Sequence, residues 1–333
     1  MAQYTPETIW QMSREELSKL LESKTFQPLS GRCIHFYAPS FAYYKTAYFC
    51  SSAKDFSTIS VTGKSCTLNC KHCGGKVLET MRPVRTPEEL YKLCAKLKRE
   101  GAVGCLISGG CLPDGSVPLE RFTEAIRRVK ADFDLTVFAH VGIVNLEKAL
   151  GLREAGVDAA LIDIIGDNET IREIYNLNVT VRDYEKALEA LSQSDLRFVP
   201  HVIVGLYYGR LKGEFHALQM ISKYKPSALV IIAFMPIYGT TMEHVKPSEP
   251  MEIARVLATA RVMFPKTPVA LGCMRPKGKH RAETDILAIK AGVDAIAFPS
   301  EEAIRYAEKN GYKIGFSSYC CSQIYADFSS LAP

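Results

Sequence analysis

Short apolar runs alternate along most of the chain with longer stretches in which apolar residues recur at helical spacing. Eight of the short runs are predicted to be strands, each followed by a helix: residues 59–62, 103–108, 135–139, 159–163, 198–204, 229–234, 269–271 and 295–298. Because strands that alternate with helices pair in parallel, the pattern predicts an α/β fold, most simply a closed (βα)8 barrel of the TIM type. A doubly wound open sheet is the alternative. In either fold, the chemistry belongs at the carboxyl ends of the strands.

The repeat defines a barrel segment over residues 56–312, with an N-terminal extension (1–55) and a C-terminal tail (313–333) outside it. The extension contains a short charged helix, roughly residues 8–21, and an aromatic-rich stretch over residues 35–49. That stretch either packs against the barrel as a plug or forms part of the wall of an apolar substrate channel. The tail is too short for another βα unit, so it could fold back over a barrel mouth.

Composition and charge exclude several classes of protein. The 333 residues are 47% hydrophobic and 23% charged, as in ordinary globular proteins. A net charge of +5 without a Lys/Arg-rich run argues against nucleic-acid binding. The longest apolar stretch, residues 228–238, is far shorter than the ~20 residues of a membrane span. The first ten residues lack a basic region followed by an apolar one, so we expect no signal peptide and a cytoplasmic protein.

The eleven cysteines are the unusual feature of the composition. A long chain without a secretory signal does not need disulfides, so this number indicates metal or redox chemistry. Cys66, Cys70 and Cys73 follow the first predicted strand on one short loop. Three thiolates at this spacing can bind three irons of a cubane cluster and leave the fourth iron without a protein ligand. A zinc site would more commonly use four ligands in two separated pairs.

A CxxxCxxC motif after the first strand of a βα barrel resembles the radical S-adenosylmethionine (SAM) superfamily. The resemblance implies a 4Fe–4S cluster on Cys66, Cys70 and Cys73, whose open iron binds the amino and carboxylate groups of SAM. One electron from the cluster then breaks the sulfonium bond and gives a 5′-deoxyadenosyl radical. His72, which precedes the third cysteine, has the position that the family usually gives to an aromatic residue beside the adenine.

Further segments resemble SAM-binding elements of the same superfamily. Ser108, Gly109 and Gly110 match the turn whose backbone takes the SAM ammonium, although Cys111 replaces its usual acidic residue. Glycine there permits close approach of the backbone. The segment 201–206, with Val204 and Gly205, resembles the strand along the adenine.

Two further residues have candidate roles beside SAM. Arg182 matches an arginine that holds the SAM carboxylate, or is a solvated helix residue. Asp163 follows the fourth predicted strand, a usual place to contact ribose or substrate, whereas Asp167 in the same loop could simply cap the next helix.

Four of the remaining cysteines are candidate ligands of a second, auxiliary 4Fe–4S cluster: Cys111, Cys273, Cys320 and Cys321. Cys111 and Cys273 follow predicted strands, and the tail would bring the adjacent pair. In biotin synthase, the position of Cys273 carries an auxiliary-cluster ligand. The alternative for Cys320 and Cys321 is a vicinal disulfide or no role. Cys94 and Cys105 are predicted to be core residues.

The resemblance to biotin synthase extends across the barrel, including residues 235–240. The cysteine-containing segments near residues 111, 273 and 320 instead resemble the two-protein lipoyl synthases. This implies a sulfurtransferase of lipoate biosynthesis that adds sulfur to C8 or C6 of a protein-bound octanoyl chain. Its partners would be an octanoylated carrier (a lipoyl domain or an H-protein-like domain), a homologous radical SAM enzyme and a low-potential electron donor.

Other functions stay open at this point. A radical SAM mutase or lyase, related to the hydrogenase-maturation and methylornithine enzymes, would need no sacrificial sulfur, and a biotin-synthase-like sulfurtransferase could use another substrate. A cysteine-rich zinc or binding protein would not cleave SAM.

A few other polar residues could also have functional roles. His140 and His201 could bind SAM or substrate, or be hydrogen-bonded core histidines. Arg275, Lys277 and Lys279 form a small basic group that could meet an acidic carrier protein or be a solvated loop.

Overall fold

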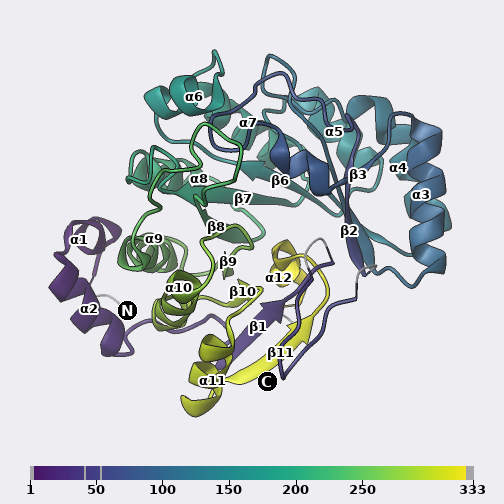
Figure 1. Cartoon of the computed structure of the whole chain (residues 1–333). Helices are drawn as coiled ribbons and strands as arrows, with labels where there is room; N and C mark the ends of the chain where they lie inside the picture. Colours follow the sequence, from purple (N-terminus) through teal and green to yellow (C-terminus); the bar gives the residue numbers. More distant parts are fainter. Residues whose placement is uncertain (1–3, 41–42, 53–54, 328–333) are drawn as a thin grey trace.

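A single curled sheet of parallel strands forms the framework of the protein (Figure 1). The computed structural model describes residues 4–40, 43–52 and 55–327. The sheet has eleven strands in the order β11-β1-β10-β9-β8-β7-β6-β5-β4-β2-β3. Their bounds are β1 Cys33–Tyr37, β2 Phe56–Ser60, β3 Arg82–Pro83, β4 Gly104–Ser108, β5 Thr136–His140, β6 Ala159–Asp163, β7 Phe198–Val204, β8 Leu229–Ala233, β9 Val269–Leu271, β10 Ala295–Ala297 and β11 Lys313–Ser317.

Helices connect most of the strands and cover the outer face of the sheet (Figure 1). Their bounds are α1 Pro6–Gln11, α2 Arg14–Glu22, α3 Pro87–Arg99, α4 Thr123–Asp132, α5 Leu146–Glu154, α6 Asn168–Tyr175, α7 Val181–Gln193, α8 Glu214–Ser222, α9 Pro250–Met263, α10 Lys279–Lys290, α11 Glu301–Lys309 and α12 Ile324–Asp327. α3 shows why they begin where they do, since Thr86 accepts a hydrogen bond from the Glu89 amide and Pro87 occupies the first turn. Within the described ranges, no helix combines the length and the hydrophobicity that a bilayer span requires.

The predicted α/β fold of TIM type is confirmed, but the expected closure of the barrel is wrong. The eight predicted strands are β2 and β4 to β10, and they are contiguous in the sheet. In a closed barrel, β10 would pair with β2. Here β10 pairs with β1 instead, and β2 pairs with β3 on its other side. Strands from the two terminal segments therefore extend the sheet, and it stays an open half-barrel.

The two faces of the sheet bury different sets of side chains, because successive residues of a strand point to opposite faces. In β6, Ala160 and Ile162 pack under the helices on the outer face. Ala159 and Leu161 belong to a second apolar cluster on the inner face, which lines the lumen of the half-barrel. By the same alternation, Asp163 points into the lumen at the carboxyl end of the strand.

The C-terminal segment enters this lumen. The short 3-10 helix Cys321–Gln323 contacts β8, β9 and β10, and Ile324 belongs to the inner cluster. Small side chains on two of the strands that it contacts, β9 and β10, make room for it: Ala270, Ala295 and Ala297. The hydroxyl of Tyr37 in β1 donates to Asp327 Oδ2 at 2.7 Å and ties the end of the described chain to the sheet. The predicted tail thus contributes a strand and a filling for the lumen, and is more than a flap over the mouth; its last six residues, 328–333, lie outside the described part.

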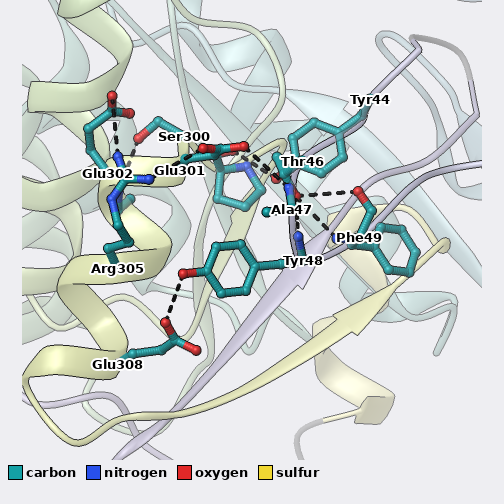
Figure 2. A network of polar contacts seen from close by, with 12 residues as sticks. Tyr44, Thr46, Ala47, Tyr48, Phe49, Ser300, Glu301, Glu302, Arg305 and Glu308 are labelled. Carbon is teal, nitrogen blue, oxygen red and sulfur yellow. Dashed lines mark hydrogen bonds and ion pairs between the residues drawn. The ribbon is translucent and has the colours of Figure 1, made fainter.

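The aromatic-rich stretch packs beside α11 and β11 in the part that is described, residues 35–40 and 43–49 (Figure 2). Tyr48 donates its hydroxyl to Glu308 Oε2 at 3.0 Å, and the Ala47 amide donates to Glu301 Oε1 at 3.3 Å. Phe49 stacks on Phe316 of β11 with ring centroids 5.3 Å apart. These contacts agree with a packing role, and the alternative of a channel wall stays a prediction.

Arg275 is fully buried, so the expected basic group around it does not form a surface. Its Nε donates to Asp285 Oδ1 at 2.7 Å, and its Nη1 donates to the Gly272 carbonyl at 2.6 Å. The side chain therefore fixes the segment after β9, which carries Cys273, against α10. Only Lys277 and Lys279 of the predicted group are exposed.

Replacing Arg275 by methionine (Arg275→Met) should lower the free energy of unfolding by about 3–5 kcal/mol, because the buried carboxylate of Asp285 would lose its partner. Urea denaturation of the full chain measures this change. Lys277→Ala is the matched control, and we expect it to change the free energy by less than about 0.5 kcal/mol because the side chain is exposed. Equal effects of the two substitutions would contradict the assigned role of the buried pair.

Candidate active site

The loop that carries Cys66, Cys70 and Cys73 begins directly after β2, at the carboxyl end of the sheet. Two features of the backbone give it a tight course. Asn69 adopts a left-handed conformation (φ 46°) between the first two cysteines, and Gly74 (φ 50°) follows the third. Left-handed residues at these points reverse the chain, so the three thiols lie on one compact loop.

The end of α6 holds the loop from one side. The side-chain amide of Asn176 donates to the carbonyls of Leu68 (3.1 Å) and Asn69 (2.9 Å). The amide of Lys71 donates to the Ile174 carbonyl at 2.8 Å. These bonds use backbone groups of the loop, so they position the cysteines without occupying their sulfur atoms.

The turn after β4 holds the loop from the other side. The amide of Gly110 donates to the hydroxyl of Thr62 at 2.7 Å, and the amide of Thr67 donates to the Cys111 carbonyl at 3.0 Å. A Cβ atom on Gly110 would lie 2.0 Å from the Ser65 carbonyl oxygen and 2.6 Å from the Cα of Cys66. Glycine is therefore required here by the cysteine loop itself, in addition to any predicted contact with SAM.

The thiols differ in their tendency to ionise. A hydrogen bond from the thiol of Cys111 lowers the pKa of Cys66 to about 5. A hydrogen bond with Cys70 lowers the pKa of Cys73 to about 4, despite burial. The pKa of Cys70 is raised by that same bond and by burial. Two of the three loop cysteines are thus poised as thiolates, the form that binds iron.

The surroundings of the loop fit a bound metal centre. The ligand atoms of Cys70, His72 and Cys73 lie within 4.8 Å of one another. Two buried polar atoms beside them, His72 Nδ1 and the Tyr175 hydroxyl, have no hydrogen-bond partner among the described residues. Their rings pack together with centroids 5.1 Å apart. Converging sulfur ligands next to unsatisfied polar atoms are the signature of a site that receives a further group.

A second polar cluster lies in the lumen, at the ends of β5 and β6 and in the middle of β7. Its members are His140, Asp163 and His201, whose ligand atoms lie within 4.8 Å of one another. Although burial by itself would raise the pKa of Asp163, the charge and hydrogen bond of His140 lower it. Burial lowers the pKa of His201 to about 4. The cluster therefore combines an anionic carboxylate with a neutral imidazole at neutral pH.

The structure places one of the four predicted ligands of the auxiliary cluster, Cys111, apart from the other three. Cys111 lies beside Cys66, and its pKa is raised by their hydrogen bond and by burial. Cys273, Cys320 and Cys321 instead lie together against the inner cluster. Burial raises the pKa of Cys273 to about 11, and the charge of Cys320 adds to this. No disulfide joins Cys320 to Cys321. Cys94 and Cys105 are fully buried on the outer side, as expected of core residues.

Three other predicted SAM contacts, Ser108, Gly109 and Val204, lie at the carboxyl ends of β4 and β7. Ser108 ends β4 and donates its hydroxyl to the His140 carbonyl at 3.2 Å. Gly109 follows it, and a Cβ there would meet Thr62 at 3.1 Å. Val204 is buried at the end of β7.

Gly205 and Arg182 are the last two predicted SAM contacts. Gly205 is hydrogen-bonded to another residue, and Arg182 lies away from the cysteine loop. The amide of Gly205 donates to the buried Glu214 at 2.8 Å, and burial raises the pKa of that carboxyl to about 7. Arg182 is exposed on the first turn of α7, and within the described ranges no hydrogen bond or ion pair joins it to the cysteine loop. Their roles toward SAM stay predictions.

Sequence reasoning missed the residues that position the loop. Tyr175 and Asn176 contact the loop, and Thr62, within the loop, accepts the hydrogen bond of Gly110. Asn176 offered a signal, since asparagine after a helical pattern is a common left-handed cap, and here it has φ 53°. Nothing in the sequence indicated that this cap would lie beside the cysteines.

Comparisons with known proteins agree with this geometry. Residues 60–209 match the model of the radical SAM superfamily, a span that begins at the end of β2 and includes the cysteine loop. The biotin synthase of Hyphomonas neptunium is 28% identical over 267 residues, which cover 76% of this chain and 79% of that protein. The biotin synthase of Zymomonas mobilis is 27% identical over 252 residues and 73% of each chain.

Solved structures support the fold. Methylornithine synthase superposes with a TM-score of 0.64 at 17% identity, covering 99% of this chain and 97% of that one. The FeFe-hydrogenase maturase from Carboxydothermus hydrogenoformans has a TM-score of 0.66 at 13% identity, covering 97% and 77%.

Residues 60–209, with the cysteine loop at the mouth of the open half-barrel, are a radical SAM domain. The chain as a whole is similar to biotin synthases. These similarities imply a 4Fe–4S cluster and SAM as cofactors. The residues that would hold the cluster are Cys66, Cys70 and Cys73.

Gly110→Ala should prevent the loop from reaching its position, because the added methyl group would overlap the backbone of Ser65 and Cys66. A displacement that costs about 1.4 kcal/mol already weakens binding about tenfold, so we expect at least about tenfold weaker retention of the first cluster. Iron content and the absorption of the reconstituted protein measure this.

Gly151→Ala is the matched control. Gly151 lies in α5, and the nearest atom to an added Cβ is 4.0 Å away. We expect this substitution to leave the iron content unchanged and to stabilise the helix by about 0.5–1 kcal/mol. Full iron content in Gly110→Ala would show that the close approach at residue 110 is not needed.

Proposed function

We propose that the protein is a radical SAM sulfurtransferase of the lipoyl synthase type, which adds sulfur to C8 or C6 of an octanoyl chain on a carrier protein. The observation that carries the proposal is the group formed by Cys273, Cys320 and Cys321 in the lumen. It lies apart from the cysteine loop but on the same inner side of the sheet as His140, whose charge reaches Cys320. A second set of thiols inside the half-barrel is what a sulfur-donating auxiliary cluster requires.

Two groups of cysteines in this chain would each bind one of two iron–sulfur clusters. When bound, the two clusters and SAM supply hydrogen-atom removal from an unactivated carbon and the sulfur that replaces the hydrogen. Cys66, Cys70 and Cys73 would hold the first cluster, with His72 beside it. Cys273, Cys320 and Cys321 would supply thiolate ligands to the auxiliary cluster. Cys111, given its position beside Cys66, is removed from the auxiliary set.

Fixed positions of the auxiliary ligands support this assignment. Arg275, two residues after Cys273, is anchored by the buried Asp285 and by the Gly272 carbonyl. The adjacent pair Cys320 and Cys321 is held in the lumen by the packing of the C-terminal segment. Ligands on a rigid scaffold keep a cluster at a constant distance from the first one.

The substrate and partners follow from the proposed reaction. Partly buried apolar residues beside the inner cluster, such as Leu106 and Ile232, suit an unbranched hydrocarbon chain. Lys277 and Lys279, which are exposed near the segment of Cys273, suit an acidic carrier domain of the lipoyl or H-protein type. A homologous radical SAM enzyme would add the other sulfur, a low-potential protein would supply electrons, and the reaction would take place in the cytoplasm.

Iron and sulfide counting on the anaerobically reconstituted protein tests the auxiliary cluster. Two 4Fe–4S clusters give about eight irons per chain. About four irons would remove the sulfur-donor assignment and favour a mutase or lyase with a single cluster.

Cys273→Ala should retain SAM cleavage, measured as 5′-deoxyadenosine formed with dithionite, and should lose about half of the iron together with all sulfur insertion. Cys94→Ala is the control, because it also removes a thiol, from a fully buried cysteine on α3 in the outer core. We expect the control to keep both the iron and the activity. Loss of SAM cleavage in Cys273→Ala would contradict the separation of the two regions.

Mass spectrometry of an octanoyl-lysine peptide, incubated with SAM and dithionite, tests the substrate. The expected product is heavier by one sulfur atom. The same assay on the mercaptooctanoyl peptide, with and without the partner enzyme, separates attack at C8 from attack at C6. No mass gain on either peptide, with about eight irons present, would overturn the lipoyl substrate and leave a sulfurtransferase of other specificity.

A further inference from the structure

The polar cluster of His140, Asp163 and His201 has no part in the proposed sulfur chemistry. The three residues come from neighbouring strands, β5, β6 and β7, and each lies on the inward-facing side by strand alternation. Asp163 and His201 are paired in register, and His140 pairs with Leu161, two residues before Asp163. The sheet itself therefore brings the three side chains to one point, without any contribution from loops.

The distances within the cluster suit a single ion. His140 Nε2 lies 3.5 Å from Asp163 Oδ1, and one ligand atom from each of the three residues lies within 4.8 Å of the other two. The imidazole centroids of His140 and His201 are 5.9 Å apart. Ligand atoms at about 2.0–2.2 Å from a common metal ion lie at most about 4.4 Å apart. The 3.5 Å between His140 Nε2 and Asp163 Oδ1 is within this limit, and a small side-chain movement would bring in the third ligand.

His201 is arranged as a metal ligand through its second nitrogen. Its Nδ1 lies 3.1 Å from the carbonyl oxygen of Val199. Because a carbonyl can only accept, Nδ1 carries the proton, and the neutral ring then presents the lone pair of Nε2. A histidine whose other nitrogen donates to a backbone carbonyl is the common arrangement around bound metals, since it fixes both tautomer and ring orientation.

We propose that His140, Asp163 and His201 bind one divalent transition-metal ion of the zinc or iron(II) type. Two imidazoles and one carboxylate are the ligand set that these ions take in open sites, where the remaining positions are left for water or for an oxygen atom of the substrate. Binding replaces the contact between His140 and Asp163 by two bonds to the ion. The site shares no ligand with the proposed iron–sulfur clusters, although His140 and Cys320 are close enough for their charges to interact, and it does not depend on sulfur insertion as the reaction.

Zinc is the probe that distinguishes this site from the clusters. The reconstituted holoenzyme is incubated with a slight excess of zinc chloride and desalted, and zinc and iron are then counted by plasma mass spectrometry. We expect about one zinc per chain with unchanged iron. X-ray absorption at the zinc edge should show only nitrogen and oxygen ligands, at about 2.0–2.2 Å.

His201→Ala and Asp163→Asn should each weaken zinc binding by more than about 100-fold, since even indirect supports of a metal ligand contribute 10- to 100-fold. Asp163→Asn keeps the size of the side chain, so it separates loss of the ligand from loss of the fold. His216→Ala is the matched control, because His216 also directs Nδ1 to a carbonyl, that of Gly166 at 2.8 Å, but lies outside the cluster.

Three outcomes would overturn the proposal. They are no zinc retained by the holoenzyme, equal zinc binding in His201→Ala and the parent protein, or sulfur ligands at the zinc edge. The iron count of the same samples reports on the clusters, so a failure here is distinguishable from a failure of the proposed function.

Discussion

The inner face of an open parallel sheet must be covered, and the rest of the structure depends on how this chain covers it. A closed barrel would fill its lumen with side chains from its own strands. Here the strands contribute small residues such as Ala270 and Ala295, and the segment around Cys321 and Ile324 fills the space. The apolar stabilisation of the lumen is therefore shared between the sheet and the C-terminal segment, and the cysteines of that segment are held inside the protein as a result.

At the mouth of the same half-barrel, backbone contacts determine where the cysteine loop lies. Asn176 holds the loop through its carbonyls, and the turn at Gly110 meets it so closely that a single methyl group would not fit. The loop is held mainly through its main chain; among its sulfur atoms, Cys70 Sγ donates to the Tyr175 carbonyl at 3.5 Å, at the same end of α6. This division between positioning groups and ligand groups is what a preorganised metal site requires.

Much of this could be predicted from the sequence, and the failures have physical causes. The bounds of β6, β7 and β9 match the prediction, because their strand patterns are clear and flanked by turns. β1 and β11 were missed because they pair with each other across nearly the whole chain, which no local pattern reveals. The spacing of the loop cysteines could be read from the sequence. The position of Cys111 beside Cys66 could not, because it depends on the close approach of the backbone at Gly110. The burial of Arg275 likewise depends on its ion pair with Asp285.

The pairing of β1 with β11 also affects the order in which the two groups of cysteines come together during synthesis. All five residues of β1 have partners in β11, near the end of the chain. During synthesis, the strands from β2 to β10 and the cysteine loop emerge long before β11 does, and contacts between distant segments form slowly. The first group of cysteines can therefore acquire its environment early. The group that includes Cys320 and Cys321 comes together only when the whole chain has been made, so a truncated product would have the first site without the second.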